Sequence, residues 1–362
     1  MFYTAAWCTS DESAFRRELP LQLLGESLKK YRSRLPLHIV LLEGIERLSA
    51  GYLRSLEETG FILVDYSAAF REIVATYPNI DAQHSRYERN CLLRWVAFRK
   101  LFKGHPDKPP QFWHLDSDVL LHTSLDELAN DTAGKTFMLQ GCPVLLTVSD
   151  PRWFEIYEAN LAAMEKDLHG YSAAAAAEKQ RCRTNDYELA NNSFYRDPIG
   201  SDQDLLEYLV SSKRLPQNDR SVIYRSRYFF VENPLAFNLA GFDRQGEEVV
   251  EFAMTADGRI QSGKKQVPFV HYQNGFARYA QVFLLLKQWH IPEWIIRLFM
   301  RYRIEEDRFI TTFGFRVLSR LWFGCHPSWG RSRVIERLND HTKGRTVADL
   351  LNFLTIYSTF RR

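Results

Sequence analysis

Residues 112–121 read FWHLDSDVLL, and this stretch decides the fold class. The apolar residues Phe112–Leu115 predict a short buried strand, and Asp116 and Asp118 follow where that strand ends. In an α/β sheet, ligands bind at the carboxyl edge of the strands. Two carboxylates at i and i+2 in that place can turn toward one divalent cation, directly or through water. The stretch therefore predicts an acidic ligand-binding pair, and solvated turn acids are the competing interpretation.

Short apolar runs alternate with amphipathic segments on the N-terminal side of this stretch, which is the order of an α/β fold. Strands are predicted at Phe2–Trp7, Leu37–Leu42 and Phe61–Val64. Helices are predicted at Leu19–Leu35, where basic residues collect near the C-terminal end, and at Tyr87–Phe102. We therefore expect a sheet with helices packed against it.

The C-terminal side of the stretch continues the mixed pattern. A strand is predicted over Thr136–Val148, interrupted by glycine and proline, and a helix over Pro151–Met164. The polar residues Arg181–Gly200 lack periodicity and predict a long ordered loop, a kind of segment that is often functional. After this loop, Gly200–Leu206 (GSDQDLL) opens a helix that we expect to run to about Val210.

A histidine stands at the end of another apolar run, VPFVHYQNG over residues 267–275. His271 is followed there by Gly275, which permits close approach of the backbone to a ligand. Imidazole is a common ligand for manganese-like ions and a less common one for Mg²⁺. A structural histidine is the competing interpretation.

Composition excludes several classes of protein. The chain has 362 residues, with 47 Lys and Arg against 44 Asp and Glu, and this balance gives no electrostatic sign of a nucleic-acid partner. The five cysteines are scattered and odd in number, which indicates a reducing compartment. The N-terminus lacks the pattern of a cleaved signal peptide, and the most apolar long window, residues 282–300, is broken by charged residues and a proline. We expect a cytoplasmic protein without a transmembrane segment.

The last part of the chain differs in charge from the rest. Residues 290–362 carry thirteen Lys and Arg against seven Asp and Glu, with tryptophans and phenylalanines interleaved at helical spacing. We expect a main domain over residues 1–289 and a basic, aromatic helical region over 290–362. Such helices suit an anionic lipid surface and would associate the protein with the inner face of a membrane. Alternatively, their aromatic residues pack them onto the main domain.

Four short motifs occur in order along the chain: Tyr87-Glu88-Arg89, Asp116-Ser117-Asp118, Asp202-Gln203-Asp204 and His271-Tyr272. Over roughly residues 1–280 this set resembles the GT-A glycosyltransferases of the glycogenin and bacterial lipopolysaccharide galactosyltransferase group. The resemblance implies an α/β fold with a Rossmann-like mixed sheet flanked by helices. It implies transfer of a sugar from a nucleotide-diphosphate-sugar donor to a glycan, lipid-linked or other acceptor, with retention of configuration.

The same resemblance assigns roles to individual residues. Asp116, Asp118 and His271 would hold Mn²⁺ or Mg²⁺, which neutralises the diphosphate of the donor. Asp202, Gln203 and Asp204 are the catalytic candidates, beside the transferred sugar. The other donor contacts would come from the first strand and from scattered polar residues: Thr4, Ala5, Ala6, Trp7, Arg86, Arg89, Asp116, Ser117 and Arg278.

The sequence departs from the family pattern in two places. Gly275 and Arg278 stand one residue farther from His271 than the pattern has them, and the acceptor-side Asn-x-Gly segment has no clear counterpart, so the acceptor is not predicted. Inversion would need a carboxylate base. The carboxylates in or beside the polar loop that could serve are Asp186, Glu188, Asp197 and Asp204.

Rival functions remain at this level. A haloacid-dehalogenase-type phosphatase also places Asp-x-Asp after an apolar strand, although its motif belongs on the first strand. A catalytically inactive sugar-nucleotide-binding protein would keep the same residues. A phosphate-loop NTPase is not supported, because Lys265 stands where the magnesium-binding Ser or Thr should be and Gly258–Lys265 predicts a turn between two strands.

Overall fold

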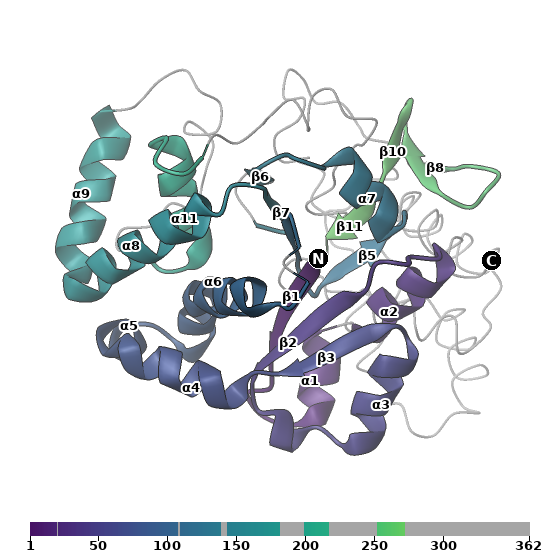
Figure 1. Ribbon diagram of the computed structural model, residues 1–362, viewed down its shortest axis with the longest axis horizontal. Helices are drawn as coiled ribbons and strands as arrows, with labels where there is room; N and C mark the ends of the chain where they lie inside the picture. The colour runs from purple at the N-terminus through teal and green to yellow at the C-terminus, as the bar shows by residue number, and fades with distance from the viewer. Residues whose placement is uncertain (20, 108, 139–142, 182–198, 217–251, 272–362) are drawn as a thin grey trace, which may run out of the picture.

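The computed structural model describes residues 1–19, 21–107, 109–138, 143–181, 199–216 and 252–271. Its main sheet has six strands in the order β3-β2-β1-β4-β7-β6 (Figure 1). Strands β1 to β4 run parallel, and β7 is antiparallel to both of its neighbours. The predicted mixed α/β sheet is therefore confirmed. The strands are β1 (Phe2–Trp7), β2 (Leu37–Glu43), β3 (Phe61–Asp65), β4 (Phe112–Leu115), β6 (Phe137–Met138) and β7 (Leu145–Val148).

Helices cover both faces of this sheet because successive side chains of a buried parallel strand point to opposite sides. Along β1, Phe2 and Ala6 enter one core while Tyr3 and Ala5 enter the other. The first core is covered by α1 (Glu12–Glu18), α2 (Leu21–Lys30), α3 (Ala50–Glu58) and α7 (Leu125–Asp131). The second is covered by α4 (Ser67–Thr76), α5 (Pro78–Gln83), α6 (Arg86–Gly104), α8 (Arg152–Lys166), α9 (Leu168–Arg181) and α11 (Asp202–Ser211).

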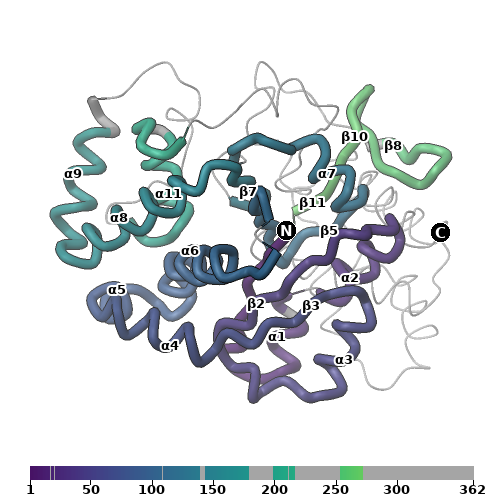
Figure 2. Tube along the Cα trace, viewed as in Figure 1, coloured from purple at the N-terminus to yellow at the C-terminus, as the bar shows by residue number. Residues whose placement is uncertain are grey.

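Helix α6 is the main helix of the second layer, and it confirms the helix predicted over Tyr87–Phe102. It begins with a capping box, in which Ser85 and Glu88 each accept a hydrogen bond from the other's backbone N–H. Its residues from Arg89 to Phe98 are buried, and it contacts α4, α5, α8 and α11 (Figure 2). This position brings the middle of α6 against the sheet and against the start of α11.

Two boundaries differ from the sequence prediction. The strand predicted over Thr136–Val148 is two antiparallel strands, β6 and β7, because the chain turns before Leu145 near Pro143, a residue that cannot donate to a strand ladder. The helix predicted over Leu19–Leu35 is shorter and is α2. The helix predicted from Gly200 to about Val210 is confirmed as α11.

Two small sheets complete the described structure. β5 (Val119–Leu121) pairs antiparallel with β11 (Phe269–His271). β8 (Phe252–Met254), β9 (Ile260–Ser262) and β10 (Lys265–Val267) form a separate meander. The stretch Gly258–Lys265, predicted as a turn between two strands, contains β9 itself, and the turn lies at its end, in the hairpin between β9 and β10, with Gly263 at a φ of 58°. This hairpin is held to α7 by two hydrogen bonds from Arg259 to Glu127, of 2.7 and 2.9 Å.

Several predicted features lie outside the described residues. They are residues 182–198 of the polar loop, Arg278, and the whole C-terminal region 290–362. Among the helices that the structure does describe, none combines the length and the apolar character needed to cross a bilayer.

Candidate active site

The acidic pair lies at the carboxyl edge of the main sheet, beside the end of β1. Tyr3 pairs with His114 in the parallel β1–β4 ladder, so two residues farther on the two strands reach Ala5 and Asp116. The backbone N–H of Asp116 donates to Val144 O at 2.9 Å, which fixes the end of β4 against the turn before β7. The ligand-binding edge predicted from the sequence is therefore occupied by Asp116 and Asp118, next to the last residues of β1.

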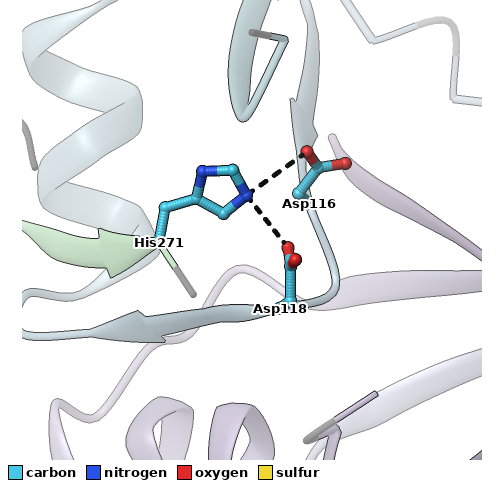
Figure 3. A group of neighbouring side chains, drawn as sticks. All are labelled: Asp116, Asp118 and His271. Atoms are coloured by element: carbon cyan, nitrogen blue, oxygen red, sulfur yellow. Dashed lines mark ion pairs between the residues drawn. The ribbon is translucent and has the colours of Figure 1, made fainter. Parts of the chain in front are cut away.

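His271 reaches this edge through the pairing of β11 with β5. Val119 is the register partner of His271, which places the imidazole next to the preceding residue, Asp118. The Nε2 atom of His271 lies 3.2 Å from Asp118 Oδ1 and 3.9 Å from Asp116 Oδ2 (Figure 3). One ligand atom from each of the three side chains lies within 4.8 Å of the others. His271 stands 155 positions after Asp116 and 153 after Asp118, and the three thus form one cluster with the donor set of a divalent-ion site.

Arg94 of α6 links this cluster to α11, and the sequence motifs did not point to it. Its guanidinium donates to Asp116 Oδ1 at 2.9 Å and to Asp202 Oδ2 at 2.8 and 3.0 Å. The side chain is only 7% exposed. The sequence does hold a signal for Arg94, which stands between Leu93 and Trp95 in an apolar part of a helix. A charged residue among such neighbours is buried only when it is paired.

His114 approaches the same carboxylate from within the sheet. Its Nδ1 lies 3.1 Å from Tyr3 O and its Nε2 lies 3.1 Å from Asp116 Oδ1, and the ring is fully buried. Burial lowers the pKa of His114, and the hydrogen bond with Asp116 offsets part of that effect. Burial alone would raise the pKa of Asp116, yet Arg94 and His114 hold that pKa well below its usual range. The carboxyl of Asp116 is therefore ionised even without a bound cation.

The two aspartates of the second acidic motif, Asp202 and Asp204, have different surroundings at the start of α11. Asp202 is 2% exposed and accepts from Trp95 Nε1 at 2.8 Å in addition to Arg94. Asp204 caps the helix, because its Oδ2 accepts from the backbone N–H groups of Gly200 and Ser201 at 3.0 and 3.1 Å. Gln203 is half-buried between them. Of these three residues, Asp202 is the one joined through Arg94 to the acidic pair.

The remaining predicted donor contacts surround the end of β1. Thr4, Ala5 and Ala6 have buried side chains, and the half-buried Trp7 meets Tyr87 edge-on, with ring centroids 5.5 Å apart. Tyr87 is 64% exposed, so the two rings form an aromatic corner open to solvent. Ser117, between the two aspartates, is buried at 9% exposure.

The two predicted arginines of α6 bond to acidic residues of the neighbouring elements. Arg89 donates to Asp81, Glu43 and Asn90, and Arg86 donates to Glu43 Oε2 at 2.6 Å. Glu43 ends β2, so these bonds tie the N-terminal end of α6 to the carboxyl edge of the sheet. The arginine that reaches Asp116 is thus Arg94, five residues farther along the helix than Arg89, which the Tyr-x-Arg motif indicated.

Comparison with known proteins gives matches in structure only. No family model matches the sequence, and no curated protein matches it. The fold is similar to that of mouse xyloside xylosyltransferase 1 in its apo form, at 12% identity and a TM-score of 0.38, over 61% of this chain and 85% of that one. It is also similar to an active-site mutant of LgtC, at 15% identity and a TM-score of 0.32, over 76% of this chain and 88% of that one. Both TM-scores lie below 0.5, so neither likeness carries a conclusion about this chain.

Proposed function

We propose that this protein is a metal-dependent glycosyltransferase with a GT-A fold, which transfers a sugar from a nucleotide-diphosphate-sugar donor to a glycan acceptor. The observation that carries the proposal is the cluster of Asp116, Asp118 and His271 at the carboxyl edge of β4, beside the end of β1. A parallel sheet binds nucleotides at this edge. Two carboxylates and an imidazole in that place suit an ion that bridges to a diphosphate.

The charge of the site supports a cation. Asp116, Asp118 and Asp202 supply three carboxylates, while Arg94 supplies a single guanidinium between two of them. A diphosphate would be repelled by this excess of negative charge unless a divalent ion neutralised it. When bound, such an ion would withdraw negative charge from the departing diphosphate. The mixed nitrogen and oxygen donor set favours Mn²⁺ over Mg²⁺, which prefers oxygen ligands and water.

The residues around the ion site have distinct proposed tasks. Trp7 and Tyr87 present aromatic surface on which a nucleobase can stack, at the end of the strand that lies beside the acidic pair. The side chains of Thr4, Ala5 and Ala6 are buried, so at these three positions β1 offers its backbone to the donor. Ser117, Arg86 and Arg89 remain proposed donor contacts at the same edge, and Arg278, which lies outside the described residues, remains a proposed contact of the diphosphate.

Asp202 and Gln203 are proposed to lie beside the transferred sugar. The Oδ2 atom of Asp202 already accepts hydrogen bonds from Trp95 and Arg94 and forms an ion pair with a second nitrogen of Arg94, so Oδ1 is the atom that can meet a sugar hydroxyl. Asp204 is proposed to act through the helix start that it caps. We propose retention of configuration, because the group that the four sequence motifs resemble transfers sugars with retention. Anomeric NMR of the first product tests this, and a product anomer opposite to that of the donor would contradict it.

The decisive experiment is a donor screen. Common nucleotide-diphosphate-sugars are incubated with the full chain and Mn²⁺, and the release of nucleoside diphosphate is measured. Asp118→Asn should reduce the rate roughly a hundredfold or more, since a bound Lewis acid supplies several kcal/mol of stabilisation. The matched control is Asp107→Asn, at an aspartate whose side chain is 85% exposed, and it should keep the full rate.

Other outcomes of this screen point to other functions. Release of phosphate from simple esters, without a sugar nucleotide, would indicate a phosphatase that uses Asp116 as its nucleophile. Binding of a sugar nucleotide without turnover would indicate a binding protein. Full activity of Asp118→Asn would overturn the assignment of the metal site.

A cytoplasmic location and an acceptor presented at the inner face of a membrane are also proposed. They rest on the basic, aromatic composition of residues 290–362, which we propose as a region separate from the domain over 1–289. Co-sedimentation of the full chain with anionic vesicles and with neutral vesicles tests this proposal. Equal recovery with both would exclude the C-terminal region as an electrostatic anchor, and the acceptor would then be sought among free glycans.

A further inference from the structure

We propose that His114 is a positioning residue for the ion ligand Asp116. In this proposal Nε2 of His114 donates a hydrogen bond to Asp116 Oδ1 and so turns Oδ2 toward Asp118 and His271. The inference rests on the proposed function, because the ion is part of it. It assigns to a buried residue of the sheet a task that none of the four sequence motifs contains.

The two oxygens of Asp116 have different surroundings. Oδ1 accepts from Arg94 at 2.9 Å and from His114 at 3.1 Å, whereas Oδ2 lies 3.9 Å from Nε2 of His271. The angle of the terminal torsion of an aspartate is otherwise broadly distributed, and two donors on one oxygen stop the carboxylate from rotating about it. Asp116 therefore offers one oxygen to an ion in a fixed direction.

His114 acts only through Asp116, because its ring is closed off from the site. It is fully buried on β4, and its ring lies against Trp95, with centroids 4.9 Å apart at an angle of 73°, and against Phe98 at 5.3 Å. Trp95 in turn donates to Asp202. The contact between the rings of His114 and Trp95 thus supports both donors, of which His114 holds Asp116 and Trp95 holds Asp202.

The direction of the hydrogen bond decides between a positioning role and a purely structural one. Tyr3 O and the carboxylate of Asp116 only accept, so a neutral ring can donate to one of them at a time. If the proton is on Nε2, the ring orients Asp116. If it is on Nδ1, the ring ties β4 to β1 through Tyr3. The proposal assigns the proton to Nε2, since a charged acceptor forms the stronger hydrogen bond.

Two substitutions separate these roles. His114→Gln places its amide nitrogen near the position of Nε2 and keeps a donor for Asp116, whereas His114→Asn places it near Nδ1 and keeps a donor for Tyr3. We expect Asn to weaken Mn²⁺ binding about 10- to 100-fold, the usual cost of losing a partner of a metal ligand, and Gln to restore most of the affinity. Mn²⁺ affinity is measured on the full chain by the electron paramagnetic resonance signal of the free ion, without substrate.

The control variant is His38→Asn on β2, which is separated from β4 by β1 in the sheet. His38 is also buried, at 6% exposure, but its Nδ1 lies 3.1 Å from the backbone oxygen of Phe2, which is a carbonyl rather than a carboxylate. It should leave Mn²⁺ affinity unchanged. Near-ultraviolet circular dichroism of all variants checks that the aromatic core is intact.

The results distinguish the inference from the proposed function. If the wild type binds Mn²⁺ and both His114 variants bind it as tightly as the wild type, the positioning role is overturned while the ion site stands. The same follows if only the Gln variant loses affinity. If the wild type does not bind Mn²⁺, the metal site fails and the role of His114 fails with it. A folded Asn variant that has lost Mn²⁺ affinity, beside a Gln variant that has kept it, supports the proposal.

Discussion

Arg94 and Asp202 are 108 residues apart in the chain, and in the structure two nitrogens of the guanidinium of Arg94 lie 3.0 and 2.8 Å from Oδ2 of Asp202. Since the same guanidinium also donates to Asp116, one cation joins the middle of α6, the end of β4 and the start of α11. Each of these elements supplies a carboxylate or its partner to the candidate site. The pair is therefore both a structural link and part of the charge balance of the site.

Removing this guanidinium should destabilise the fold. In Arg94→Ala the buried carboxylate of Asp202 and the partly buried one of Asp116 lose their counter-charge, and a cost of about 3–5 kcal/mol in the free energy of unfolding is expected. Urea denaturation followed by fluorescence measures it. Arg152→Ala is the control, because Arg152 pairs with Asp150 at the start of α8 and its side chain is 75% exposed, so its loss should cost far less. Equal losses in the two variants would contradict the role of the buried pair.

Gly25 of α2 should not accept a side chain. A Cβ there would overlap the side chain of Thr59 and lie 2.9 Å from Cε2 of Phe61, so Gly25→Ala should cost about 1–3 kcal/mol through overpacking. Gly51, also in a helix, has nothing within 4 Å of the same position, and Gly51→Ala should stabilise the protein by about 0.5–1 kcal/mol. Thermal unfolding of both variants checks that the two shifts have opposite signs.

His122 should make stability depend on pH. Burial, together with the charge of Lys30, lowers its pKa to about 3, whereas in the unfolded chain the pKa is about 6.5. Above about pH 6.5 the ring is neutral in both the folded and the unfolded chain, so the free energy of unfolding has its full value there. Below it the unfolded chain takes up a proton that the folded chain does not, so the free energy of unfolding falls by up to about 1.4 kcal/mol per pH unit toward pH 3.

The variant His122→Gln tests this dependence, because it removes the titrating group and leaves the other buried histidines in place. Its stability deficit relative to the wild type should shrink as the pH falls from about 6.5 to about 4. Urea denaturation at a series of pH values measures the difference. A deficit that stays constant across this range would show that the buried ring does not resist protonation.

Binding of Mn²⁺ should raise the melting temperature of the wild type. An ion that binds only the folded chain stabilises it by about 2.7 kcal/mol at a concentration one hundred times its dissociation constant. Differential scanning fluorimetry with added Mn²⁺, and again after addition of a chelator, measures the shift and its reversal. Asp118→Asn should abolish the shift, and Asp107→Asn should keep it.

The sequence by itself determined the first four strands of the sheet, helix α6 and the edge of the sheet at which the site lies. Apolar runs with turn residues beside them marked β1 to β4, and helical spacing marked α6, because both patterns follow from side chains that are close in the chain. Asp116 and Asp118 were located in the same way, since a strand end is a local property. The pairing of His271 with this edge rested on a family resemblance rather than on any local pattern.

Only the tertiary structure decided which side chains meet. The register of β11 on β5 brings His271 to Asp118, and the rotation of α6 about its axis turns Arg94, rather than Arg89, toward Asp116. The contact of His114 with Asp116 Oδ1 depends in the same way on how β4 packs against α6. Register and rotation are set by packing over the whole core, so a short stretch of sequence leaves them open even where it specifies the strand and the helix.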